Sequence, residues 1–73
     1  LHSVLLSPGA GAIGRTLDDL NLEQLGCEVS AIRRRGIRAV EPAPETRLEE
    51  GDVVVVLGAP EAVTAAEERL LQN

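Results

Sequence analysis

The sequence predicts a small α+β domain with the element order β-α-β-β-β-α. Its 73 residues suffice for one domain, and 44% hydrophobic with 26% charged residues is an ordinary globular composition. The apolar run 53–58 (VVVVLG) indicates a buried strand, and the segment after Pro60 repeats apolar residues at helical spacing. One folded module is therefore expected over residues 1–73.

The N-terminal segments predict a strand, a glycine loop and a short helix. Residues 2–7 (HSVLLS) are apolar and partly β-branched, and the Pro-Gly pair that follows ends the run. The next leucines fit a helical stripe only in part. Thr16 has Asp19 three residues further on, which is the spacing of a capping box and favours a short helix at 16–20.

Residues 27–40 are predicted to form a β-hairpin, with Gly36 in the turn and a short strand at 37–40. The partial alternation in 27–34 predicts two faces, one with Cys27, Val29 and Ala31 and the other with Glu28, Ser30, Ile32 and Arg34. Pro42 and Pro44 prevent the hairpin from continuing as a central strand.

The C-terminal third predicts a strand followed by a helix. Successive apolar residues in 53–58 predict burial on both faces of the sheet. Pro60 suits the first helical position, and Val63, Ala66 and Leu70 follow at helical spacing, so a helix to about residue 72 is expected.

Composition excludes several classes of function. A net charge of −5 argues against nucleic-acid and anionic-membrane partners, and the absence of an apolar run long enough to span a bilayer argues against membrane insertion. Cys27 is the only cysteine and His2 is the only histidine, which leaves no Cys/His zinc site and no internal disulfide. Because Ser3, Ser7 and Ser30 have no visible base, no catalytic residues are predicted and the chain is not expected to be an enzyme. The lone thiol fits the cytoplasm, and the start at Leu1 suggests a segment of a longer chain.

The segment 9–14 (GAGAIG) has the G-x-G-x-x-G pattern of dinucleotide-binding loops. Arg33 and Arg34 lie near the distance at which such folds read the ribose. The hairpin predicted at residues 27–40 stands where a dinucleotide-binding fold would have its crossover connection. This favours an ordinary loop over a pyridine-nucleotide site. Both interpretations stay open.

Arg33, Arg34 and Arg35, with Arg38 nearby, form a basic cluster in an acidic chain. Guanidinium groups pair with phosphate or carboxylate, so the cluster predicts an anionic effector or an acidic partner surface. The alternative is a solvated turn with surface ion pairs to Glu28 or Glu41. The carboxylates at 18–19, 49–50 and 52 fit no Ca²⁺ loop, so no metal site is predicted.

Several segments taken in order resemble the RCK C-terminal (TrkA-C) domain over residues 2–72: Ile13-Gly14-x-Thr16-Leu17-x-x-Leu20, Val29-x-Ala31-Ile32-x-Arg34-x-Gly36, then Pro42, Leu48, Gly51-Asp52 and Gly58. The resemblance implies a four-stranded partial barrel or sheet capped by the C-terminal helix. It also implies a homodimer that regulates a potassium channel, a potassium transporter or a monovalent cation/proton antiporter from the cytoplasmic face. The hairpin looks most similar to those of Kef-type antiporters.

Some members of this family bind a small ligand at the dimer interface, with cyclic di-AMP as the best-known case. Carried over by position, Ile32, Arg34 and Ile37 are the candidate ligand-binding residues here, with Arg33, Arg35 and Arg38 as neighbouring cations. The expected partners are a second copy and the membrane-embedded transporter portion. No cofactor is implied beyond such a nucleotide effector. A dimerisation module without a ligand is the alternative.

Overall fold

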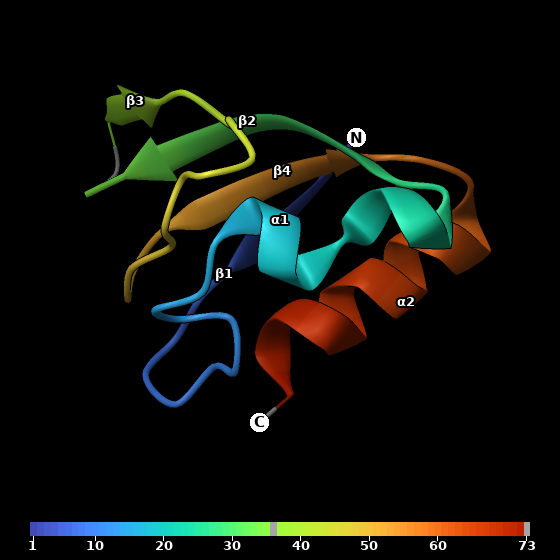
Figure 1. Cartoon of the computed structure of the whole chain (residues 1–73), viewed down its shortest axis with the longest axis horizontal. Coiled ribbons are helices and arrows are strands. Elements are labelled where there is room, and N and C mark those ends of the chain that lie inside the picture. The colour runs from blue at the N-terminus through green and yellow to red at the C-terminus, as the bar shows by residue number, and fades with distance from the viewer. Residues whose placement is uncertain (36, 73) are drawn as a thin grey trace.

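The computed structural model describes residues 1–35 and 37–72 and confirms the predicted α+β class (Figure 1). Its elements are β1 (His2–Leu5), α1 (Leu17–Leu20), the 3₁₀ helix η1 (Leu22–Leu25), β2 (Glu28–Arg34), β3 (Arg38–Val40), β4 (Val53–Leu57) and α2 (Pro60–Leu71). The strands form one antiparallel sheet in the order β1-β4-β2-β3. The turn predicted at Gly36 lies outside the described residues.

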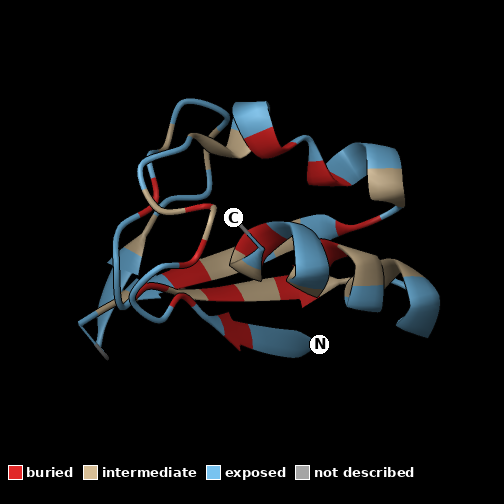
Figure 2. Ribbon diagram, turned by 90° about the horizontal axis from the view of Figure 1, so that it is seen from below, coloured by how far each residue is buried: buried red, intermediate tan, exposed pale blue. Residues whose placement is uncertain are grey.

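The core lies between one face of this sheet and the helical segments. Val4, Ile32, Val54 and Val56 contribute this face, and all are 2% exposed or less. Ala66 and Leu70 of α2 and Leu20 and Leu22 of α1 and η1 cover it. Figure 2 shows α1 and η1 on one side of the sheet. Burial of these aliphatic side chains is the main force holding the fold together.

The opposite face of the sheet is uncovered, so the predicted burial of the 53–58 run on both faces is wrong. Val54 and Val56 are fully buried, whereas Val53, Val55 and Leu57 are only half-buried. Leu5 of β1 is the partner of Val53 on the neighbouring strand β4, and Leu5 is 58% exposed. The correction has a simple cause, because every helix packs on the Val54 side.

A β-bulge in β2 overturns the predicted alternation of its side chains. Val29 pairs with Val56 and Ala31 pairs with Val55, so Ser30 is an extra residue between them. An extra residue reverses which face the following side chains occupy. Ile32 therefore shares the core face with Val29, not with Ser30, and Ala31 lies on the uncovered face.

The predicted short helix is confirmed, including its N-cap. The Asp19 N–H donates to Thr16 Oγ1 at 3.1 Å, and the helix ends at Asn21 in the left-handed region. Arg69 of α2 then donates from Nη1 to the Leu20 carbonyl at 2.9 Å. A side-chain donor thus satisfies a carbonyl that the short helix leaves without an internal partner.

Candidate functional site at the arginine turn

The hairpin end carries the exposed part of the predicted site, here called the arginine turn: Arg33, Arg35, Ile37 and Arg38. All four are exposed, and Ile37 is 87% exposed. Arg35 has φ +56°, in the left-handed region, as a residue in a tight turn often does. Arg33 pairs with Ala39 and Val53, which places it on the uncovered face of the sheet.

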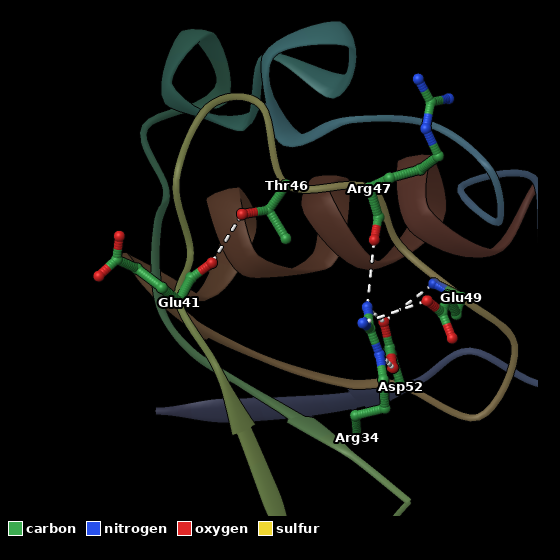
Figure 3. A network of polar contacts seen from close by, with 6 residues as sticks. All are labelled: Arg34, Glu41, Thr46, Arg47, Glu49 and Asp52. Atoms are coloured by element: carbon green, nitrogen blue, oxygen red, sulfur yellow. Dashed lines mark hydrogen bonds and ion pairs between the residues drawn. The ribbon is translucent and has the colours of Figure 1, made fainter.

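Arg34 is the exception within the arginine cluster, because its side chain turns into the domain (Figure 3). Nε donates to Asp52 Oδ1 at 2.8 Å and Nη2 donates to Asp52 Oδ2 at 2.9 Å, a bidentate pair. Nη2 also donates to the Arg47 carbonyl at 3.1 Å, and Nη1 lies 3.2 Å from Glu49 Oε2. The ion pairs thus use Glu49 and Asp52, and the expected partners Glu28 and Glu41 are wrong for Arg34.

Asp52 is completely buried, and its charge depends on these contacts. Burial by itself would raise the pKa of the carboxyl group, but the hydrogen bonds from Arg34 and from the Glu49 N–H together hold that pKa below its ordinary value. The hydrogen bond to Asp52 in turn raises the pKa of Arg34. The sequence analysis noted Asp52 among the loop carboxylates but did not pair it with Arg34, from which it is separated by 18 residues.

Ile32 also lies away from the surface. It is 0% exposed and packs in the core opposite Val54. The six predicted ligand-binding residues therefore divide into two structural groups. Ile32 and Arg34 make contacts within the domain, whereas Arg33, Arg35, Ile37 and Arg38 remain accessible to a ligand.

A groove of ≈ 610 Å³ lies near the other end of β2, between α1, η1 and the segment after β3. Leu17, Leu22, Val29 and Leu57 line it with Pro42 and Pro44. Asp18, Glu23 and Glu28 add carboxylates to this lining, and all three are exposed. β3 pairs only with Ile32, Arg33 and Arg34, so the part of β2 beside the groove has no strand partner in β3.

The exposed charges at the two ends of β2 are opposite in sign. Among the described residues, the ion pairs involve neither the exposed arginines of the turn nor the carboxylates of the groove. The domain is therefore polarised along β2, with free guanidinium groups at one end and free carboxylates beside the groove at the other.

The glycine loop does not have the geometry of a dinucleotide site. The Ala12 N–H donates to the Leu70 carbonyl at 3.1 Å, and the Gly14 N–H donates to the Leu48 carbonyl at 2.9 Å. These amides therefore serve the C-terminal end of α2 and the loop before β4, not a pyrophosphate. The helix that follows, α1, has only 4 residues. Over residues 1–35 and 37–72, no group of His, Cys, Asp and Glu side chains could hold a metal ion.

The model of the TrkA-C domain family matches residues 1–71. The chain belongs to the TrkA-C domain family. This result confirms the resemblance seen in the sequence, and the family is one of regulatory domains of potassium transport proteins. In the described part of this TrkA-C domain, no helix is long and apolar enough to cross a membrane.

Two longer proteins are similar to this TrkA-C domain in sequence. A protein of Alkalimonas amylolytica that carries the name K(+) efflux antiporter KefB is 36% identical over 66 residues, which cover 90% of this chain and 10% of that protein. An uncharacterized transporter of Bacteroides thetaiotaomicron is 40% identical over 74 residues, covering 100% of this chain and 13% of that protein. The chain thus spans about a tenth of the length of these relatives.

Solved structures share the fold. The RCK_C domain dimer of Streptococcus agalactiae BusR in complex with c-di-AMP has a TM-score of 0.80 and 21% sequence identity, covering 94% of this chain and 92% of that one. BusR in complex with its busAB-promotor DNA has a TM-score of 0.76 and 22% identity, covering 94% of this chain but 34% of that one. At this identity the likeness establishes the fold of the TrkA-C domain.

Proposed function

We propose that this TrkA-C domain is a non-enzymatic regulatory module at the cytoplasmic face of a membrane. It forms a homodimer and binds a small anionic effector, and the bound state biases cation transport by the attached potassium transporter or cation/proton antiporter. A ligand shifts such an equilibrium only by its different affinities for the two states. The proposal names a nucleotide such as cyclic di-AMP as the effector class.

The observation that carries the proposal is the set of free guanidinium groups at the arginine turn. Arg33, Arg35 and Arg38 are exposed in a chain of net charge −5, and Arg34 is already neutralised by Asp52. Free guanidinium groups bind phosphate through charge-assisted hydrogen bonds. The BusR relative with c-di-AMP and the KefB relative support the choice of effector and of transporter.

Titration of the isotope-labelled chain with cyclic di-AMP, followed by amide shifts, tests the effector. We expect saturable shifts at the arginine turn, and an affinity lowered about tenfold or more in the Arg35→Ala/Arg38→Ala variant, since each lost charge-assisted bond contributes roughly 1.5–3 kcal/mol. Arg15→Ala, an exposed arginine outside the turn, is the matched control. Unchanged affinity in the double variant, or no saturable shift, contradicts the effector site.

A dimerisation module without an effector is the second candidate. The uncovered sheet face favours it, because Leu5, Val53 and Val55 lie together there and a contiguous exposed apolar patch is typical of a contact surface. This candidate predicts that Arg35→Ala/Arg38→Ala leaves the regulation of the parent transporter unchanged. The effector proposal predicts that the same variant abolishes the response of cation flux to cyclic di-AMP while basal flux is retained.

A further inference from the structure

The strand β1 has a free side, because it lies at the edge of the sheet opposite β3. The Leu6 N–H donates to the Asp52 carbonyl at 2.8 Å, which continues the ladder between β1 and β4 by one hydrogen-bonded pair. Bonded and non-bonded pairs alternate along an antiparallel ladder, so Val4 also bonds to β4, whereas Ser3 and Leu5 direct their N–H groups to the free side. Over residues 1–35 and 37–72, no loop or turn carbonyl accepts a hydrogen bond from these two N–H groups.

The side chains of β1 leave this edge unprotected. Edge strands in natural sheets usually carry charged side chains, proline or a bulge, which discourage pairing with another chain. β3, at the other edge, has Arg38 in the strand and Pro42 shortly after it. β1 has no lysine, arginine, carboxylate or proline, and its register with β4 is regular over His2–Leu5. The edge at β1 is therefore suited to pairing with a further strand.

The exposed leucines of this edge fit a second copy of the same strand. Leu1 is 88% exposed and Leu5 is 58% exposed, and the period of a strand places both on the uncovered face. A two-fold axis at Ser3 sets each Leu1 opposite Leu5 of the partner subunit, and Ser3 opposite Ser3 of the partner subunit. In this register the free N–H groups of Ser3 and Leu5 face the free carbonyls of Ser3 and Leu1 in the other copy. One arrangement thus covers the exposed leucines and satisfies the unpaired N–H groups.

We propose that β1 pairs antiparallel with β1 of a second copy, which joins two four-stranded sheets into one continuous sheet. The two copies of Leu1 and Leu5 then extend the apolar patch around Val53 across the two-fold axis. Because β1 and β3 are opposite edges, the arginine turn stays accessible in this assembly. The contact goes beyond the proposed function, since it requires neither the effector nor a particular surface for the homodimer. Where the homodimer uses another surface, the β1 contact joins two dimers.

Charges placed at the two-fold axis test this pairing. The Ser3 side chain is exposed, and side chains directly opposite each other in an antiparallel pair interact. Ser3→Lys and Ser3→Glu each oppose like charges and are expected to lose one step of assembly, from dimer to monomer or from tetramer to dimer. Sedimentation equilibrium should show the dissociation constant of that step raised about fivefold. Ser7→Lys, at an exposed serine beyond the strand, is the matched control and keeps the wild-type assembly.

An equimolar mixture of the two Ser3 variants restores opposite charges across the axis. Native mass spectrometry is expected to show the recovered assembly with both variants in it. Amide hydrogen exchange of the wild type reads the register, because the N–H groups of Ser3 and Leu5 should gain protection as the protein concentration rises. The Val4 N–H, which bonds to β4, should be protected at every concentration.

The outcomes separate this contact from the proposed function. If the wild-type assembly persists in both Ser3 variants, or if exchange at Ser3 and Leu5 is independent of concentration, the β1 pairing is overturned and the homodimer stands. The edge is then left to a strand of another chain. A monomeric wild type overturns the β1 pairing and the homodimer together, whereas the effector site is judged by its own titration.

Discussion

Arg34 and Asp52 form a bidentate pair that joins the end of β2 to the start of β4, with N–O distances of 2.8 and 2.9 Å. The Asp52 side chain is fully buried and the Arg34 side chain is 18% exposed. Arg34 also contacts Arg47 and Glu49, so one guanidinium fixes the segment between β3 and β4 to the sheet. Arg34, one of the candidate ligand-binding residues carried over by position, makes these contacts within the domain.

Removal of the guanidinium should destabilise the domain strongly. In Arg34→Ala the buried Asp52 charge loses its partner, and breaking a buried pair in this way costs roughly 3–5 kcal/mol. Urea unfolding followed by far-UV circular dichroism measures the loss. Arg33→Ala, the neighbour on the uncovered face, should change the free energy of unfolding by less than about 0.5 kcal/mol. Equal effects of the two substitutions would contradict a structural role specific to Arg34.

The pH dependence of stability should reveal the Asp52 carboxylate. Its pKa in the folded state lies below the ordinary 3.8, so the folded state favours the deprotonated form. The stabilisation is therefore complete above this ordinary value and is lost as the pH falls through the lower, folded-state pKa. The difference in free energy of unfolding between wild type and Asp52→Asn should shrink under acid conditions. A difference between wild type and Asp52→Asn that stays constant with pH contradicts the assignment.

Ile32 and Ile37 should separate stability from binding. Ile32→Ala creates a cavity in the core opposite Val54 and should cost about 2–5 kcal/mol of unfolding free energy. Ile37→Ala removes an exposed side chain and should leave stability within about 0.5 kcal/mol while weakening the binding of cyclic di-AMP. Thermal unfolding and titration with cyclic di-AMP measure the two quantities. If Ile37→Ala unfolded the domain, the exposed placement of this residue would be wrong.

The glycine loop should not respond to pyridine nucleotides. The amides of Ala12 and Gly14 are already donors to the carbonyls of Leu70 and Leu48. A pyrophosphate would have to break both hydrogen bonds and expose the buried Ala12, so NADH should cause no saturable amide shifts at residues 9–14. Cyclic di-AMP titrated in parallel is the positive comparison. Saturable NADH shifts confined to this loop would restore the dinucleotide interpretation.

The sequence by itself determined the elements whose causes are local. Four consecutive valines fix a strand because β-branched side chains pack on a pleated surface, and Pro60 at the start of α2 suits the first turn of a helix. The Thr16 side chain caps α1 by accepting a hydrogen bond from the backbone N–H of Asp19, three residues further on. Each of these features depends on residues that are close together in the sequence, so it can be predicted without knowledge of the fold.

The tertiary structure alone decided which arginine is buried and which residues remain free for a ligand or partner. The bulge at Ser30 and the pairing of β2 with β4 put Ile32 in the core and bring Arg34 beside Asp52, 18 residues away. Nothing within the run of arginines distinguishes one member from the next. The register between distant strands does so, because it is set by the total burial of the apolar face, a property that no single segment carries.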